Sequence, residues 1–262
     1  MFFKNKIVWI TGASSGIGEA LTYALNNENA KVIISARRKT ELERVKSNCK
    51  NNPDENIYIL ELDLLDTSTF EQKTKNIIEK FGRIDILINN GGMSQRALVK
   101  DTDYSVIKKL MDINFYGSIM LTKSVLPFML AQKSGNIVVM SSLTGKFGTR
   151  LRSAYAASKH ALHGFFDSLR AETWQDNIKI MLVCAGYIKT NISVNALTGN
   201  GTPQNTMDEG QAKGMLPEQL TKKILKGIKR SKNELLIGGF ETLGVYIKRF
   251  FPNLFFRIIR NK

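Results

Sequence analysis

Two residues of the kind used for proton transfer stand four positions apart in the chain. Tyr155 and Lys159 lie in Ser-Ala-Tyr-Ala-Ala-Ser-Lys at residues 153–159. In a helix, side chains at i and i+4 share one face. A cation beside a phenol favours the phenolate and moves the tyrosine pKa from about 10 toward neutral pH. The pair indicates general acid–base chemistry. For so short a pattern, a surface helix that merely carries both residues is the alternative.

A second pattern is a glycine-rich stretch near the N-terminus. The apolar run 6–10 leads into Thr-Gly-Ala-Ser-Ser-Gly-Ile-Gly at 11–18, and a helix-like segment, 19–27, follows. Strand, glycine-rich turn and helix together bind the pyrophosphate of a dinucleotide at the helix N-terminus. An ordinary glycine-rich turn is the alternative. The candidate cofactor-binding residues here are Gly12, Ser14, Ser15, Gly16, Ile17 and Gly18.

Three further motifs lie between and beside these two. Asn-Asn-Gly-Gly at 89–92 follows an apolar run, Asn114 lies in Asp-Ile-Asn-Phe-Tyr-Gly at 112–117, and Ser142 stands thirteen positions before Tyr155. In order and spacing, the five motifs resemble the short-chain dehydrogenase/reductase family over about residues 5–240. Residues 89–96 and 158–166 resemble in particular its member-7-type branch, an often membrane-associated group.

The resemblance implies reversible hydride transfer between a nicotinamide and a carbonyl or alcohol carbon. Tyr155 would donate the proton, and Lys159 would lower the pKa of Tyr155 and hold the nicotinamide ribose. Ser142 would orient the substrate oxygen and stabilise its developing charge. Asn114 would position a water that connects Lys159 to solvent. The expected catalytic residues are Asn114, Ser142, Tyr155 and Lys159, and Asn90 and Gly91 are expected to contact the cofactor.

The end of the second predicted strand, 31–35, bears on which nicotinamide cofactor is used. NAD-binding chains usually place a carboxylate there to accept from the ribose 2′-hydroxyl. This chain has Ala36 instead, followed by Arg37 and Arg38. Because a guanidinium binds a phosphate through two donors, we expect a 2′-phosphate site and therefore NADP. A solvated arginine pair is the alternative. By resemblance, Asp63 lies near the adenine ring.

The segment after the sixth predicted strand should face the nicotinamide. The family usually has Pro-Gly at this turn, whereas this chain has Ala185 before Gly186, and loss of a fixed φ could loosen the turn. We expect Ile188 and Thr190 to contact the nicotinamide carboxamide. Residues 191–216 are rich in Asn, Gly and Thr, and so long an irregular stretch predicts a substrate lid. Candidate pocket residues are Met93, Leu143, Phe147, Tyr187 and Met207.

Apolar runs and helix-like stretches alternate through the 262 residues. This order predicts an α/β chain with a single-domain Rossmann-type, doubly wound parallel sheet. We assign residues 1–242 to one NADP-binding Rossmann domain and 243–262 to a basic aromatic C-terminal tail. The predicted strands are 6–11, 31–35, 57–61, 84–89, 136–141, 178–184 and 234–237.

The cysteine and histidine residues predict no metal site. Cys49 and Cys184 are the only cysteines, and neither has the spacing of a disulfide framework or ligand cluster. His160 and His163 are expected to pack or to face solvent. The N-terminus lacks a signal-peptide pattern, and the cysteine usage is compatible with a reducing compartment. We therefore expect a cytoplasmic protein, peripheral on a membrane if the tail binds one.

The chain is strongly basic, with a net charge of +15. Residues 217–262 carry eleven Lys and Arg against three Glu, so more than half of the excess lies there. In residues 243–262, large apolar side chains alternate with cations around Pro252. This composition is too charged for a spanning helix but fits a segment lying on an anionic membrane. A tail packed on its own domain or in an oligomer is an equally weighted alternative.

Together, the motifs predict an NADP(H)-dependent oxidoreductase, a carbonyl reductase or alcohol dehydrogenase, acting on a lipophilic ketone, aldehyde or alcohol. A catalytically silent NADP-binding sensor or scaffold is the alternative. We expect no nucleic-acid partner, because the basic residues interleave with aliphatic ones and no nucleic-acid module is visible. The family resemblance also implies a homodimer or homotetramer.

Overall fold

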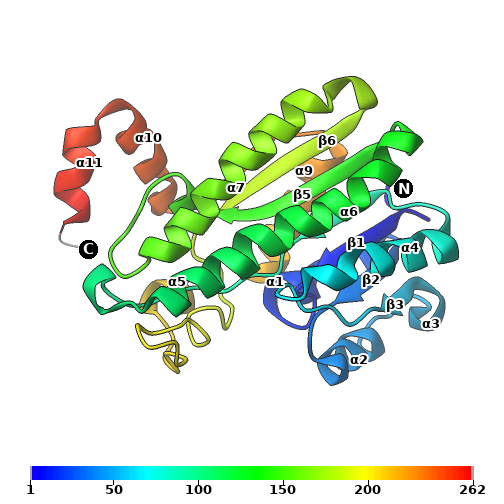
Figure 1. The fold of residues 1–262 in the computed structure, drawn as a ribbon, viewed down its shortest axis with the longest axis horizontal. Helices are drawn as coiled ribbons and strands as arrows, with labels where there is room; N and C mark the ends of the chain where they lie inside the picture. Colours follow the sequence, from blue (N-terminus) through cyan, green and yellow to red (C-terminus); the bar gives the residue numbers. More distant parts are fainter. Residues whose placement is uncertain (1, 261–262) are drawn as a thin grey trace.

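Seven parallel strands form the central sheet of the computed structural model, which describes residues 2–260. Their order is β3-β2-β1-β4-β5-β6-β7 (Figure 1). Sheet order reverses between β1 and β4, and this is where an open α/β sheet binds its ligands. The strands are β1 (Ile7–Thr11), β2 (Lys31–Ser35), β3 (Ile57–Ile59), β4 (Ile86–Asn89), β5 (Gly135–Ser142), β6 (Ile178–Ala185) and β7 (Glu234–Ile237). The predicted fold class is confirmed.

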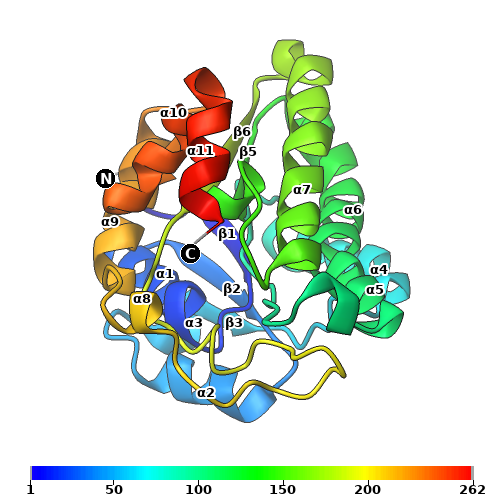
Figure 2. The ribbon, with the colours of Figure 1, turned by 90° about the vertical axis from the view of Figure 1, so that its left-hand side faces the viewer.

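Helices cover both faces of the sheet, as Figure 2 shows edge-on. Within β1, Val8 and Ile10 point to one face while Ile7 and Trp9 point to the other, so each face has its own buried apolar cluster. The helices are α1 (Gly16–Asn27), α2 (Lys39–Ser47), α3 (Pro53–Asn56), α4 (Phe70–Phe81), α5 (Tyr104–Met111), α6 (Gly117–Gln132), α7 (Ser153–Glu172), α8 (Glu209–Ala212), α9 (Pro217–Lys229), α10 (Leu243–Phe250) and α11 (Pro252–Ile259). Helices α1 and α9 pack on one face and α4, α6 and α7 on the other.

All seven predicted strands are present, and three are shorter than expected, the first by one residue at its start. The third ends at Ile59 and the fourth begins at Ile86. Beyond β3 the chain stays beside β2, since Leu60 N–H donates to the Ile34 carbonyl at 3.0 Å. Before β4, the Ile84 N–H donates to the Gln132 side chain on α6. The apolar patterns thus locate all seven strands, but they do not give the exact strand ends.

Between α5 and α6 the helix widens into one π-helical turn, Asp112–Tyr116. Such a turn inserts an extra residue into the helical path and often occurs at functional sites. Asn114 lies inside this turn and is fully buried. The π turn therefore directs an amide side chain inward.

Residues 191–216 form a mostly irregular segment, as expected from their composition. Short helix α8 interrupts it, and isolated bridges join Leu197 to Gln95 and Met215 to Ile188. The Asp208 carboxylate joins this segment to Arg96. The segment is therefore attached to the domain at several points along its length.

The C-terminal tail forms two short helices, α10 and α11, which lie beyond the end of α7 (Figure 1). Phe255 is buried against Phe147, with ring centroids 5.1 Å apart, and the Lys248 ammonium donates to the Lys146 carbonyl at 2.8 Å. The tail thus packs on its own domain through part of its surface. Among the described residues, no helix is both long and apolar enough to cross a membrane.

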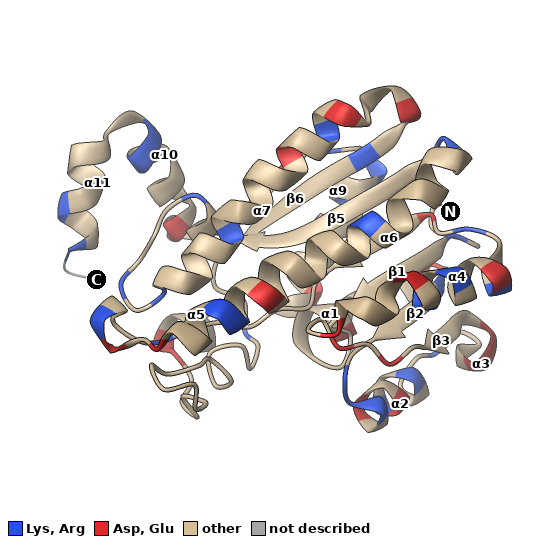
Figure 3. Cartoon of the chain, viewed as in Figure 1, with Lys and Arg blue, Asp and Glu red and all other residues tan. Residues whose placement is uncertain are grey.

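The other side of the two tail helices is apolar and exposed. Lys and Arg stand on both helices (Figure 3), and residues 243–260 contain no acidic residue. Lys262, a cation expected to aid surface binding, lies outside the described residues. The exposed large side chains of the two helices and the turn between them are Leu243, Tyr246, Phe250, Phe251, Leu254, Phe256 and Ile258.

Candidate active site

Two adjoining cavities lie at the carboxyl ends of the strands. A cleft of about 510 Å³ runs over the ends of β1 and β2, and a pocket of about 160 Å³ lies over the ends of β5 and β6. Ile17, Gly92 and Thr190 line both. A long ligand in the cleft and a smaller one in the pocket would therefore lie next to each other. Doubly wound sheets bind dinucleotides at this position.

The glycine-rich turn forms the floor of the cleft. Gly12 has a φ of +65°, and a Cβ there would lie 2.7 Å from the Gly91 Cα. A Cβ on Gly18 would overlap the Gly12 carbonyl oxygen. Ser15 makes no side-chain cap to α1, so the backbone N–H groups of its first turn are not covered by that side chain. These features fit a pyrophosphate at the helix N-terminus.

Asn90 fixes this floor to the neighbouring strand. Its side chain donates to the Thr11 carbonyl at 2.9 Å and the Gly12 carbonyl at 3.2 Å. The Thr11 hydroxyl accepts from the N–H groups of Asn90 and Gly91, both at 3.0 Å. The predicted cofactor residue Asn90 therefore joins the ends of β1 and β4.

Most of the remaining predicted cofactor residues border the same cleft, whereas Ile188, Tyr155 and Lys159 line the smaller pocket. Arg37 and Arg38 are exposed at the end of β2, and within the described chain no hydrogen bond or ion pair is formed by either side chain. Asp63 accepts from the Leu65 N–H at 3.0 Å. The predicted residues that line the cleft are Gly12, Ser14, Ser15, Gly16, Ile17, Arg37, Arg38, Asp63, Asn90, Gly91 and Thr190.

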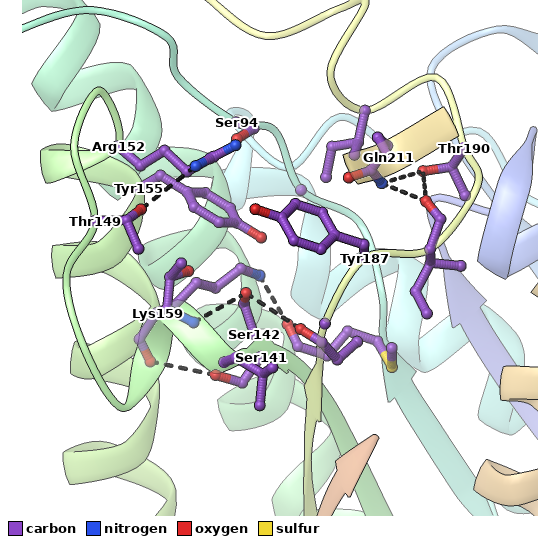
Figure 4. Close-up of a pocket in the computed structure, with 18 of the residues that line it drawn as sticks. Ser94, Ser141, Ser142, Thr149, Arg152, Tyr155, Lys159, Tyr187, Thr190 and Gln211 are labelled. Carbon is purple, nitrogen blue, oxygen red and sulfur yellow. Dashed lines mark hydrogen bonds between the residues drawn. The ribbon is translucent and has the colours of Figure 1, made fainter. Parts of the chain in front are cut away.

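Three of the four predicted catalytic side chains meet in the smaller pocket (Figure 4). Tyr155 and Lys159 share one face of α7, and the Lys159 ammonium lies 5.8 Å from the centre of the Tyr155 ring. Ser142 ends β5, and its hydroxyl donates to the Ala185 carbonyl at 3.3 Å. A helix and a strand therefore bring a phenol, an ammonium and a hydroxyl to one cavity.

Burial dominates the electrostatics of this group. Tyr155 is half-buried in the pocket wall, and this burial raises the pKa of Tyr155, while the Ser142 hydrogen bond and the charges of Arg96 and Arg152 oppose the rise. The expected lowering of the Tyr155 pKa by Lys159 stays a prediction. Burial also lowers the pKa of Lys159 to about 8, and its ammonium donates to the Met140 carbonyl at 2.7 Å.

Asn114 lies next to this group rather than in the pocket wall. Its amide donates to the Met93 carbonyl and the Ser158 hydroxyl, and its oxygen accepts from the Met93 N–H at 2.8 Å. A Cβ on Gly92 would lie 3.0 Å from the Asn114 oxygen and 3.6 Å from the Lys159 nitrogen. Asn114 thus fixes the chain after β4 beside Lys159, and its expected role in positioning a water stays a prediction.

The turn after β6 is firmly held despite Ala185. Gly186 donates to the Ile237 carbonyl at 2.7 Å, and the Tyr187 N–H donates to the Glu241 carboxylate at 3.2 Å. A Cβ on Gly186 would overlap that carboxylate. Contacts from β7 and Glu241 therefore restrain the turn that lacks the family's proline. This leaves Ile188 in the wall of the smaller pocket, and its expected contact with the nicotinamide carboxamide stays a prediction.

The substrate side of the pocket is largely apolar. Of the predicted lining residues, Met93, Leu143, Phe147 and Tyr187 are present. In Figure 4 the hydroxyl of Tyr187 points across the pocket toward that of Tyr155. The prediction for Met207 is wrong, because its sulfur accepts from the Ser193 hydroxyl and its side chain lies outside the pocket wall.

A charged cluster beside the pocket was not predicted from the sequence. Arg96 and Arg152 both line the cavity and both bond to the Asp208 carboxylate. Asp208 stands 112 positions after Arg96, and no motif connects the two. Gln211 was also missed, and its amide donates to the Ile188 carbonyl and, at 3.4 Å, to the Thr190 hydroxyl.

His163, Cys184 and Glu234 meet behind the pocket, although the sequence predicted no ligand cluster. Burial raises the pKa of the Cys184 thiol to about 12, and the Glu234 carboxylate is paired with the Lys146 ammonium at 2.5 Å. The Ser141 hydroxyl and the His163 ring nitrogen are 3.0 Å apart. The candidate ligand atoms of these three side chains lie within 4.8 Å of one another, and the expectation that the chain holds no metal stays a prediction.

Comparison with known proteins decides the family. The family model for short chain dehydrogenases matches residues 6–200. The chain belongs to the short-chain dehydrogenase/reductase family. It is 43% identical to a "Dehydrogenase/reductase SDR family protein 7-like" of Anopheles gambiae, over 99% of this chain and 83% of the relative. It is 41% identical to human family member 7, over 95% and 75% of the two chains, and 36% identical to mouse member 7B, over 100% and 82%.

Solved structures share the fold. A short-chain dehydrogenase from Streptomyces avermitilis superposes with a TM-score of 0.82 at 24% identity, covering 96% of this chain and 94% of that one. Levodione reductase gives the same score and identity, covering 92% and 99%. This short-chain dehydrogenase/reductase is therefore an oxidoreductase that uses NAD or NADP, similar in sequence to members 7 and 7B.

Proposed function

We propose that this enzyme is an NADP(H)-dependent carbonyl reductase or alcohol dehydrogenase acting on lipophilic ketones, aldehydes or alcohols. The observation that carries the proposal is the meeting of Tyr155, Ser142 and Lys159 in a pocket next to the glycine-floored cleft. When bound, the nicotinamide supplies or accepts the hydride.

The chain's own groups handle the substrate oxygen and its proton. Because its pKa is raised by burial, Tyr155 holds its proton at neutral pH and can donate it to the carbonyl oxygen. Ser142 donates a hydrogen bond to the same oxygen as negative charge develops on it. Lys159, whose pKa is lowered to about 8, holds the ribose hydroxyls and can return a proton toward Tyr155.

The preference for NADP rests on the end of β2. Arg37 and Arg38 border the cleft, and Ala36 stands where NAD-binding chains carry a carboxylate. An arginine whose side chain is not engaged in a bond within the described protein remains available for a phosphate dianion. The 2′-phosphate would therefore bind between these two side chains.

Lipophilic substrates fit the pocket and the surface around it. Leu143 and Phe147 give one wall an apolar character, and Phe147 also contacts Phe255 of the tail. Residues 191–216 would close the pocket as a lid, since Ile192 lines both cavities. The exposed apolar side and the cations of α10 and α11 would lie on an anionic membrane, from which such substrates can be drawn.

The assembly proposed is a homodimer or homotetramer, joined through the helices that carry Asn114 and Tyr155. Exposed large side chains on this side of the molecule, Tyr104, Tyr116 and Met120, support the proposal, because large apolar side chains are enriched in interfaces. Light scattering of the intact protein tests it, and a monomeric mass at micromolar concentration contradicts it.

An NADPH-oxidation screen tests the proposed activity. Aldehydes and ketones graded by lipophilicity are offered to wild type and to Tyr155→Phe. We expect turnover that increases with lipophilicity and requires Tyr155. Absence of turnover throughout, with NADPH binding intact, would favour a sensor or scaffold over an enzyme.

A further inference from the structure

Two arginines and one aspartate form a cluster between the pocket and residues 191–216. Arg96 donates through Nε, at 2.8 Å, and through Nη2 to the Asp208 Oδ2. Arg152 donates through Nη2 to the same oxygen at 3.0 Å. The other oxygen of Asp208 accepts from the Gln204 amide at 3.1 Å. One carboxylate thus serves two guanidinium groups, and this cluster carries a net charge of +1.

The two arginines differ in how fully their donors are used. Arg96 also donates through Nη1 to the Ser94 hydroxyl and the Gln95 carbonyl, and its side chain is 8% exposed. Arg152 makes one other hydrogen bond within the described protein, to the Thr149 hydroxyl at 3.5 Å, and its side chain is 19% exposed. Since a guanidinium has five N–H donors, Arg152 retains several.

The unused donors of Arg152 belong to the substrate pocket. Arg152 and Thr149 both line the cavity, and Figure 4 shows them beside Tyr155. The charge of Arg152 reaches the phenol, because it opposes the rise in the Tyr155 pKa. None of the Arg152 nitrogens is among the buried unpaired polar atoms of the described residues, so its unused N–H groups are open to water or to a ligand in the pocket, and a ligand acceptor there would be charge-assisted.

We propose that Arg152 binds an anionic oxygen group of the substrate, so that the preferred substrates are lipophilic carbonyl compounds that also carry a carboxylate. The inference rests on the proposed reductase function and adds a substrate class to it. The apolar body of such a molecule lies against Leu143 and Phe147, its carbonyl meets Tyr155, and its carboxylate accepts from Arg152 and Thr149. A guanidinium and a carboxylate form two parallel hydrogen bonds, which fixes orientation as well as affinity.

A purely structural role for Arg152 predicts different behaviour. In that case Arg152 serves only to hold Asp208, and with it residues 191–216, in place. Asp208→Asn and Arg152→Met would then impair all substrates alike and to similar extents. If Arg152 binds the substrate, Asp208→Asn instead leaves the guanidinium in the pocket and removes a competing negative charge. The two variants therefore separate the roles.

The experiment compares matched pairs of probes. A substitution that lowers the activity toward both members of a pair equally leaves their ratio unchanged. Oxo-acids with two to six carbons between carbonyl and carboxylate are each compared with their methyl ester. For each pair, kcat/KM with NADPH gives an acid-to-ester ratio. Wild type, Arg152→Met, Arg152→Lys and Asp208→Asn are measured, and calorimetry of the same probes on the NADP-bound protein gives the same ratio from binding alone.

We expect wild type to prefer the acid at one or more spacings. Arg152→Met should lower that ratio by roughly ten- to a hundredfold, the range of a charge-assisted hydrogen bond. Arg152→Lys should retain part of it, and Asp208→Asn should keep or raise it. Equal use of acid and ester by wild type at every spacing, or an equal fall in Asp208→Asn and Arg152→Met, overturns the inference. Tyr155-dependent reduction of the esters would still support the reductase function in that case. If no probe is reduced, the reductase proposal is contradicted, while the calorimetric ratio still decides whether Arg152 binds the carboxylate.

Discussion

Replacement of Arg37 by alanine should remove much of the preference for NADPH over NADH. Arg37 is exposed at the cleft and forms no side-chain bond to the described part of the protein, so its loss should leave the fold intact. What is lost is one charge-assisted contact to the 2′-phosphate, worth about 1.5–3 kcal/mol. NADPH affinity should therefore fall roughly ten- to a hundredfold, whereas NADH affinity should change little.

Fluorescence titration of each cofactor measures both dissociation constants directly, without a substrate. Lys123→Ala is the matched control, because it removes an exposed cation of α6 that is not part of the cleft wall. The control should lower NADPH affinity only slightly, through the general loss of positive charge. Rising salt should reduce the NADPH preference of wild type, since exposed charges are screened.

Two results would refute this reasoning. Equal affinity of wild type for NADPH and NADH would show that the end of β2 does not bind a 2′-phosphate. Full preference retained in a variant with Arg37 and Arg38 both replaced by alanine would place the phosphate contact elsewhere. If the preference for NADPH falls partly in Arg37→Ala and disappears in the double variant, both side chains contact the phosphate.

Three further predictions follow from the pocket and the tail. Tyr155→Phe removes only the transferable proton, so kcat should fall by at least ~10² while NADPH affinity stays unchanged. Full activity of this variant would exclude Tyr155 as the proton donor. Lys159→Met should weaken NADPH binding yet stabilise the fold at neutral pH by up to about 3 kcal/mol, because Lys159 has a pKa of about 8 in the fold against 10.5 when unfolded. Burial makes protonated Lys159 the unfavourable state in the fold. The free energy of unfolding of wild type should therefore rise as pH rises from about 8 to about 10.5, and the stability advantage of the variant should shrink. A difference in denaturant midpoint between the two proteins that does not change with pH would contradict this. A chain ending at Thr242 should lose co-sedimentation with anionic vesicles at low salt but keep NADPH binding, and wild type remaining in the supernatant would rule out the membrane role.

The residues that border the cleft could be predicted from the sequence because their signals are local. Gly12 directly follows β1, and Gly18 lies in the first turn of α1. At each position a Cβ would approach neighbouring backbone too closely, which is the steric reason for glycine. Tyr155 and Lys159 are one helical turn apart on α7. Patterns of this kind need only the correct local element to place the side chains together.

The substrate side was predicted less completely, because its contacts join distant segments. The bonds of Arg96 and Arg152 to Asp208 span 112 and 56 positions, and no periodicity encodes them. The pKa of Tyr155 likewise follows from burial, which a motif does not reveal. In the tail, alternating aromatics and cations did not distinguish Phe255, which packs on the domain, from the exposed Phe256.

Phe255 and Phe256 are neighbours on α11, and they face different surroundings. Phe255 touches Phe147, which lines the substrate pocket, while Phe256 is 49% exposed. The outer side of this helix can be covered by detergent, by lipid or by another copy of the chain. Only the one helix separates that covering from the pocket wall. A Michaelis constant for a lipophilic substrate should accordingly vary with the detergent and the amount of lipid surface in the assay, and it has meaning only when both are stated.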